Sequence, residues 1–450
     1  MREPEFFDEN NAKYFWHPMA HPAEMKTRPP VVIAAAEGVH ITDVHGHTAL
    51  DAVGGLWNVN LGFSNTKIKE AIRTQLDTLP YYSSFRGTSN TAAVELSVVL
   101  RKWFEPDGLV RAFFCSGGSD AIETALRLAR QYHRIHGQLD RTKFISLRQG
   151  YHGTHFGGAS INGNAKFRRN YEPMLPGCFH IPAPWAYRNP FSESDPARLA
   201  ELVAGALEAE IKFQSPDTVA AFIMEPVLGA GGVIPPHRSF MPMVRDICDR
   251  YGVLLIADEV ITAFGRTGHW TGSRMWGVKP DLMCCAKGIT NGYFPFGATL
   301  LSEKVADAFE SNTDGFGSIG HGYTYSAHPV GAAAALATLA ETERLNVAAN
   351  AAARGDELMS ACLALQDRHE LIGDVRGKGL MLALELVTDR ESKTPADKRL
   401  LDKILDVTYE NGVMIRVSGN DIILSPSLVI TAENVATIAS AIDRALTSVA

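Results

Sequence analysis

Three segments of the chain join a strand-like apolar run to side chains that could do chemistry. In the first, Phe-Phe-Cys at 113–115 leads into Ser-Gly-Gly-Ser-Asp at 116–120, and a helical pattern follows at once. Gly117 and Gly118 let backbone N–H groups approach an anion, Ser119 adds a hydroxyl, and the helix start adds the positive end of its dipole. This segment suits a phosphate monoester. It is neither a G-x-G-x-x-G dinucleotide motif nor a P-loop, because no Gly-Lys-Ser/Thr follows.

In the second and third segments an apolar run ends in a charged side chain. Val-Leu-Leu-Ile-Ala at 253–257 precedes Asp258, and Leu-Met-Cys-Cys-Ala at 282–286 precedes Lys287. The ligand crevice of an open α/β sheet lies outside the carboxyl ends of its strands, where both side chains are expected. A carboxylate there needs a cationic or protonated partner. A lysine there can have a depressed pKa and act as a Schiff-base amine.

Each of these features alone has an ordinary explanation: a capped glycine turn, a helix-capping aspartate or a surface lysine. Together they place phosphate-binding groups, a carboxylate and an amine at neighbouring strand ends. Pyridoxal 5'-phosphate (PLP) carries a phosphate, a pyridine nitrogen and an aldehyde, which match these three groups. The sequence therefore predicts a PLP site in which Lys287 holds the cofactor and Asp258 pairs with its ring nitrogen.

A mostly parallel sheet would bring these segments together. Apolar runs predict strands at 111–115, 143–147, 219–225, 253–258 and 282–286, and helical periodicity predicts helices at 120–136, 198–213 and 240–251. Alternation of such strands and helices indicates an α/β sheet covered by helices on both faces. We expect this large PLP-binding domain to span 61–327.

The two ends of the chain show a different pattern. A hairpin is expected around 38–46, and an Ala-rich helix begins near Pro329. Strand-like runs follow at 375–386, 413–417 and 421–424, and a last helix begins near Ala432. This order predicts a smaller α+β domain built from both termini, with segment 1–60 joining residues 328–450.

Composition excludes several classes of protein. The 450 residues are 46% hydrophobic and 21% charged, with a formal charge of −7, as in an average globular protein. We find no basic block for nucleic acid, no amphipathic basic tract or apolar span for a membrane, and no signal peptide. Six cysteines lack disulfide or zinc spacing, and His40, His45 and His47 indicate a surface hairpin rather than a metal site. We expect a cytoplasmic protein with small-molecule substrates and no metal.

The chain resembles the class III aminotransferases, of PLP fold type I, over nearly its whole length. The matching motifs are Ser-Gly-Gly-Ser-Asp-Ala at 116–121, Gly-Tyr-His-Gly at 150–153, Met-Glu-Pro-Val at 224–227, Ala-Asp-Glu-Val-Ile-Thr-Ala-Phe-Gly-Arg-Thr-Gly at 257–268, Ala-Lys-Gly at 286–288 and Gly-Tyr-Thr-Tyr-Ser-Ala-His-Pro at 322–329. The combination of Asp-Glu-Val with Lys-Gly is highly specific for this family. One departure is Gly117, which stands where many relatives have a serine.

The resemblance implies a role for each matching residue. Lys287 would bind PLP covalently and later move the proton between substrate carbon and cofactor, while Asp258 would keep the ring nitrogen protonated. The other implied cofactor contacts are Gly118 and Ser119 at the phosphate, Tyr151 and Val260 on the two ring faces, Glu225 behind the ring nitrogen, and Thr324 at the phosphate of the neighbouring subunit. The last role implies a homodimer with shared active sites, or a tetramer of two such dimers.

The resemblance also indicates a class of substrate. Leu56, Trp57 and Phe85 match pocket positions of ω-amino acid:pyruvate and amine:pyruvate aminotransferases. Arg416 matches their mobile arginine, which binds the keto acid carboxylate and moves away for an apolar amine; a plain surface arginine is the alternative. If Arg86 faces the pocket, a carboxylate-bearing donor is favoured.

The predicted reaction is a ping-pong transfer of the amino group of an ω-amino acid or primary amine to a keto acid, pyruvate. Three alternatives stay open. They are an aminomutase or racemase on the same fold, an aminotransferase for polyamine or taurine donors, and a PLP-binding protein without catalysis.

Overall fold

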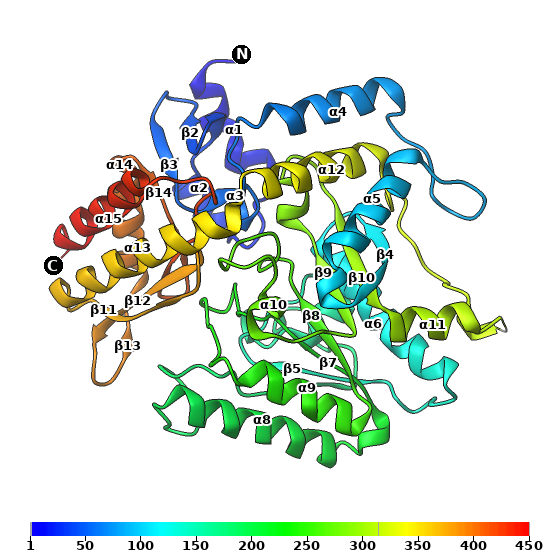
Figure 1. Ribbon diagram of the computed structural model, residues 1–450. Coiled ribbons are helices and arrows are strands. Elements are labelled where there is room, and N and C mark those ends of the chain that lie inside the picture. Colours follow the sequence, from blue (N-terminus) through cyan, green and yellow to red (C-terminus); the bar gives the residue numbers. More distant parts are fainter. Residues whose placement is uncertain (1, 314, 450) are drawn as a thin grey trace.

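The computed structural model describes residues 2–313 and 315–449 (Figure 1). At its centre is a seven-stranded sheet in the order β4-β10-β9-β8-β7-β5-β6. The strands are β4 (Leu109–Cys115), β5 (Lys143–Leu147), β6 (Cys178–Ile181), β7 (Val219–Met224), β8 (Leu254–Asp258), β9 (Leu282–Cys285) and β10 (Gly297–Ser302). Strands β5 to β9 pair in parallel, and only β10 runs antiparallel to its neighbours. The predicted mostly parallel sheet is confirmed.

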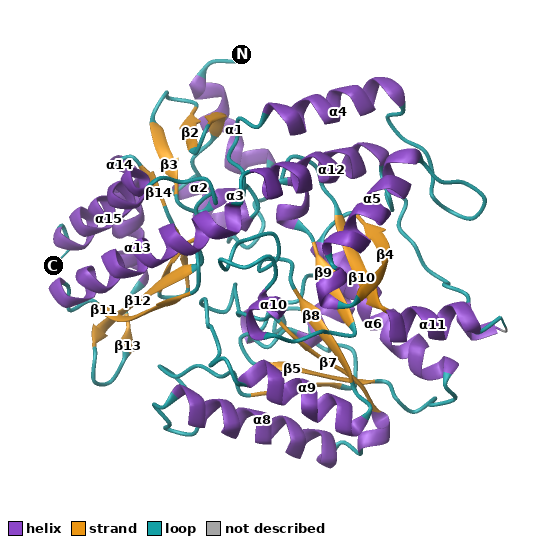
Figure 2. Ribbon diagram, viewed as in Figure 1, coloured by secondary structure: helices purple, strands orange, loops and turns teal. Residues whose placement is uncertain are grey.

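Helices cover both faces of this sheet (Figure 2). On one face, α8 (Pro196–Phe213) and α9 (Phe240–Tyr251) pack on a cluster that includes Phe222. On the other, α6 (Gly118–Ile135) packs on a cluster that includes Ile223. Successive side chains of a strand point to opposite faces, so a strand covered on both sides is apolar throughout. All residues of β7 are accordingly buried.

The two termini of the chain meet in a smaller α+β unit. Strands β1 (Ile33–Glu37), β2 (His40–Asp43) and β3 (Thr48–Asp51) form a sheet that the C-terminal strand β14 (Val413–Met414) completes. A second sheet has the order β11-β12-β16-β15, with β11 (Ile372–Gly377), β12 (Leu382–Asp389), β15 (Arg416–Ser418) and β16 (Asp421–Leu424); β13 (Thr394–Pro395) pairs with β12. Helices α13 (Val347–Arg368), α14 (Lys398–Glu410) and α15 (Ala432–Thr447) share its core. The domain boundaries at 60 and 327 stay a prediction.

Several strands differ from expectation. The run 375–386 falls on two strands, β11 and β12, which pair in antiparallel fashion. The run 413–417, expected as one strand, forms two strands that join two sheets: Val413–Met414 pairs with β3, and Arg416–Ser418 pairs with β16. Ile415, buried between them, marks the change of sheet. Strand β10 has no counterpart among the predicted strands, because its residues directly follow the Gly-rich turn after Lys287.

Further helices and turns connect these layers. The helices are α1 (Pro4–Tyr14), α2 (Pro22–Thr27), α3 (Gly54–Trp57), α4 (Thr66–Thr78), α5 (Thr91–Trp103), α7 (Phe156–Ile161), α10 (Gly272–Trp276), α11 (Glu303–Ser311) and α12 (Pro329–Arg344). The short 3-10 turns are η1 (Glu105–Asp107), η2 (Ala165–Phe167), η3 (Pro216–Thr218), η4 (Lys287–Thr290) and η5 (Gly315–Gly317). Across the described part of the chain, no helix is long and apolar enough to cross a membrane.

Candidate active site

A cavity of about 360 Å³ lies at the carboxyl edge of the central sheet. Glu225 follows β7, Asp258 ends β8 and Lys287 follows β9, and all three side chains line the cavity. These strands are parallel, so their carboxyl ends meet at one edge. The start of α6 contributes Gly118 and Ser119 to the same cavity. The fold therefore brings the three chemical segments of the sequence together.

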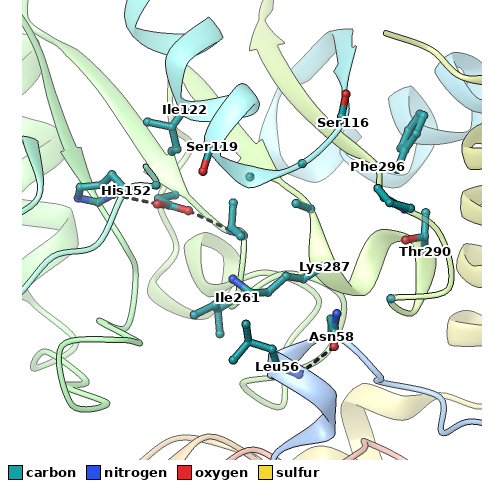
Figure 3. A pocket seen from close by; sticks show the side chains of 18 of the residues that line it. Leu56, Asn58, Ser116, Ser119, Ile122, His152, Ile261, Lys287, Thr290 and Phe296 are labelled. Atoms are coloured by element: carbon teal, nitrogen blue, oxygen red, sulfur yellow. Dashed lines mark hydrogen bonds and ion pairs between the residues drawn. The ribbon is translucent and has the colours of Figure 1, made fainter. Parts of the chain in front are cut away.

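Lys287 reaches into the cavity from the turn after β9. In Figure 3 its amine points toward Ile261, while Ser119 stands at the start of α6 on the far side. Lys287 has a φ of +48°, in the left-handed region that non-glycine residues rarely adopt. Burial lowers the pKa of its amine, against the opposing charges of Asp258 and Glu225. A lowered pKa leaves more of the amine unprotonated, which is the form that attacks a carbonyl.

The Asp258 carboxylate is held by a histidine of the Gly-Tyr-His-Gly motif for which the sequence predicts no role. His152 Nδ1 lies 2.8 Å from Asp258 Oδ2, and both side chains are buried. The Val260 N–H donates to the other oxygen, Asp258 Oδ1, at 3.1 Å. One signal could have indicated His152: Gly-Tyr-His-Gly begins three residues after β5, whose carboxyl end lies at the same sheet edge.

Glu225 holds backbone groups around the cavity. Its Oε1 accepts a hydrogen bond from the Tyr151 N–H at 3.0 Å, and its Oε2 accepts one from the Gly229 N–H at 2.7 Å. Burial and the neighbouring Asp258 carboxylate raise the pKa of Glu225 to about 7. The Tyr151 ring packs against Phe167, with ring centroids 4.8 Å apart. Glu225 thus fixes the segment that presents Tyr151 to the cavity.

Comparison with known proteins assigns this site to a family. The pattern of the family described as Aminotransferase class-III matches residues 22–446. The chain belongs to the class III aminotransferases. A solved amine transaminase from an uncultivated Pseudomonas species, in a PLP-bound form, is 46% identical with a TM-score of 0.96, and the match covers 97% of this chain and 99% of that one.

Two curated relatives are similar over most of their length. The omega-aminotransferase of Caulobacter vibrioides is 36% identical, with 98% of each chain covered. The putrescine–pyruvate aminotransferase of Pseudomonas aeruginosa is 36% identical, with 89% of this chain and 86% of that one covered. The predicted fold, enzyme class and cofactor are therefore confirmed: this aminotransferase uses PLP and acts on small-molecule amines and keto acids.

The cavity residues of this aminotransferase fit PLP. Among the described residues, no side chain caps the start of α6, which leaves its first N–H groups free to bind a phosphate. A Cβ atom on Gly118 would lie 2.9 Å from Val260 Cγ1, so this part of the helix start has no room for a side chain. The carboxylate of Asp258 and the amine of Lys287 line the same cavity. Phosphate, ring nitrogen and aldehyde each have a chemically suitable partner.

Trp57 and Arg416, both predicted to bind substrate, do not line this cavity within the described chain. Trp57 is buried in an apolar cluster on which the cavity residue Ile261 packs. Arg416 is partly buried at the start of β15. Their substrate contacts stay predictions.

Phe85, Arg86 and Thr324 also lie outside the cavity in the chain as described. Phe85 and Arg86 line a separate cavity beside His321. Thr324 is exposed, and its carbonyl accepts a hydrogen bond from the Tyr81 hydroxyl at 2.8 Å. The predicted contact of Thr324 with a partner's phosphate is untested.

Gly118→Ala is expected to weaken PLP binding about tenfold, because the new methyl group would push Val260 into the cavity. Gly117→Ala is the matched control: a Cβ there meets nothing within 4 Å, and its φ of 173° is extended backbone. PLP release during dialysis, followed by absorbance, would give both dissociation constants. Equal weakening in the two variants would contradict the prediction.

Proposed function

We propose that this aminotransferase transfers the amino group of an ω-amino acid or primary amine to pyruvate, in two half-reactions at one site. Arg416 carries the proposal. Burial lowers the pKa of its guanidinium, and within residues 2–313 and 315–449 no carboxylate forms an ion pair with it. A buried guanidinium without a counterion is stabilised by the carboxylate of a substrate, which it can bind through two parallel hydrogen bonds.

Arg416 is close enough to the cavity to act on its residues. After burial, its charge is a further cause of the lowered pKa of Lys287. The same charge opposes the rise that burial causes in the pKa of Tyr151. A keto acid bound through its carboxylate to Arg416 would therefore lie close to the amine of Lys287.

PLP, when bound, supplies a ring that accepts the electron pair left on the substrate carbon. The chain would supply the rest. Lys287 would take the proton from the substrate carbon and return it at a second atom, in both half-reactions. Asp258, oriented by His152 at 2.8 Å, would hold the proton on the ring nitrogen. The N–H groups at the start of α6 would anchor the phosphate.

We further propose a homodimer in which the partner subunit completes the site. Exposed apolar side chains gather on the segments that carry Phe85 and Thr324: Tyr81, Phe85, Phe316, Ile319 and Tyr325 are all at least 40% exposed. Apolar patches of this kind usually mark protein interfaces. Small-angle scattering at micromolar concentration would distinguish a dimer from a monomer or tetramer.

The visible spectrum of the holoenzyme tests the reaction. We expect the yellow absorbance of the bound cofactor to bleach with an amine or β-alanine and to return with pyruvate, forming alanine in equal amounts. Return without added keto acid would indicate an aminomutase or racemase instead. A band that no amine bleaches would indicate a PLP-binding protein without transferase activity.

Arg416→Met is expected to raise the KM for pyruvate about a hundredfold, because a charged hydrogen-bond pair is lost. Methionine keeps an unbranched apolar stem in place of the arginine side chain. Bleaching by an amine without a carboxylate should stay within about twofold of wild type, since that substrate has no group for Arg416. Single-turnover absorbance measures both half-reactions. An unchanged KM for pyruvate would contradict the prediction.

A further inference from the structure

Arg376 is a buried arginine that the proposed chemistry does not use. Its side chain is 8% exposed in β11 and pairs with three carboxylates of the C-terminal sheet. Nη2 lies 2.7 Å from Asp421, and Nη1 lies 2.8 Å from Glu385 and 2.9 Å from Asp374. Nε donates to the carbonyl of Gly232 at 2.8 Å. This guanidinium therefore joins the C-terminal sheet to a loop of the central sheet.

That loop runs to Gly232 from Glu225, which lines the active-site cavity. The Gly229 N–H donates to Glu225, the carboxylate that also holds the Tyr151 segment. Gly232 has a φ of +118°, and a Cβ there would lie 2.7 Å from Asp421 Oδ2. Only glycine fits such a conformation and such a close approach. The loop backbone is thus packed directly onto the Arg376–Asp421 ion pair.

The other end of the ion pair holds the hairpin that carries Arg416. Asp421 begins β16 and pairs with Ser418 of β15, two residues after Arg416. Strand β15 is the edge strand of its sheet, and β16 is its one sheet neighbour in the described chain. The position of Arg416 therefore depends on how β16 is anchored, and Asp421 is an anchor at the turn end.

We propose that Arg376 and Asp421 are positioning residues for the substrate carboxylate. Their ion pair fixes the Arg416 hairpin against the loop behind Glu225, so that guanidinium and cofactor site keep a constant separation. The inference rests on the proposed role of Arg416. It predicts that breaking the pair weakens binding of carboxylates and leaves carboxylate-free amines unaffected, because the latter need no fixed guanidinium.

Asp421→Asn and Arg376→Lys test this in the holoenzyme. Asparagine is isosteric with aspartate, and Arg376 keeps Glu385 and Asp374 as counterions, so we expect the variant to fold. Titration calorimetry with propionate, an unreactive carboxylate, gives an affinity that requires no turnover. We expect the dissociation constant to rise about tenfold in both variants, while the rate of bleaching by a carboxylate-free amine stays within about twofold of wild type.

Asp107→Asn is the matched control. Asp107 is also buried and pairs with Arg274, Oδ2 to Nη2 at 2.6 Å, between η1 and α10 rather than within the C-terminal sheet. It should lower the thermal midpoint and leave propionate binding unchanged. A loss of propionate affinity in Asp107→Asn equal to that in Asp421→Asn would overturn the inference, because general destabilisation would then explain both.

Arg416→Met separates this inference from the proposed function. If it weakens propionate binding but Asp421→Asn and Arg376→Lys do not, the positioning role is wrong and the function of Arg416 stands. If Arg416→Met itself leaves propionate binding unchanged, the proposed carboxylate site is wrong and the inference falls with it. Should Arg376→Lys fail to fold, Asp421→Asn alone decides.

Discussion

Lys287→Ala is expected to lower turnover of any amine with pyruvate by about ten thousandfold, which is the scale of general acid–base catalysis alone. Among the described residues that line the cavity, Lys287 has the only amine. No other lining side chain can both attack an aldehyde and move a proton at the substrate carbon. The variant should still bind PLP, because the start of α6 and the Asp258 carboxylate are unchanged.

Two measurements separate catalysis from cofactor binding in this variant. Alanine formation gives the turnover, and absorbance after gel filtration gives the PLP retained. Lys287→Arg is the matched control: it keeps the charge and approximate length, but its guanidinium stays protonated and cannot act as the base. We expect it to be as inactive as the alanine variant. Turnover above about one hundredth of wild type in Lys287→Ala would show that another group is the base.

Much of the central sheet could be predicted because its strands are buried on both faces. The limits of β5 and α9 match their predicted ranges. An apolar run without polar alternation can be a strand only where helices cover both sides. Strand β10 follows the same physics, but Gly297 continues a Gly- and Pro-containing turn, which hides where the strand begins.

The candidate site could be predicted only where residues follow strands of the central sheet. Asp258 and Lys287 end or follow neighbouring parallel strands, so topology alone brings them together. Phe85 and Thr324 lie on loops whose distance from the sheet no periodicity encodes, and both are exposed. His152 also follows a strand, but a histidine in a loop has no distinctive pattern, and its partner Asp258 is 106 residues away.

The sequence Asp258-Glu259 raises the question of which carboxylate serves the cofactor. The two side chains have different surroundings. Glu259 is fully buried outside the cavity lining and accepts hydrogen bonds from the backbone N–H groups of Gly272 and Ser273, at 2.8 and 2.6 Å. Hydroxyls of Ser273 and Thr262 donate to it as well. Glu259 therefore stabilises the start of α10, whereas Asp258 lines the cavity.

Asp258→Asn is expected to slow both half-reactions about a thousandfold, which is the typical loss when one preorganised electrostatic group is removed. Asparagine keeps the shape and the contact with His152, but it has no negative charge to hold a proton on the ring nitrogen. The cofactor would then accept electrons poorly while remaining bound. Single-turnover bleaching with an amine, and its reversal with pyruvate, would show both losses.

Glu259→Gln is the matched control, because it makes the same change from carboxylate to amide at the next residue of the chain. Its four hydrogen-bond donors would face a neutral amide that cannot accept all of them, so we expect a lower thermal midpoint. The rates of both half-reactions should stay within about threefold of wild type, because Glu259 does not line the cavity. The reverse result, a slow Glu259→Gln and a fast Asp258→Asn, would exchange the two roles. The two adjacent carboxylates thus have different roles, because the end of β8 points Asp258 into the cavity and Glu259 into the core. Asp258 serves the cofactor, and Glu259 stabilises the fold.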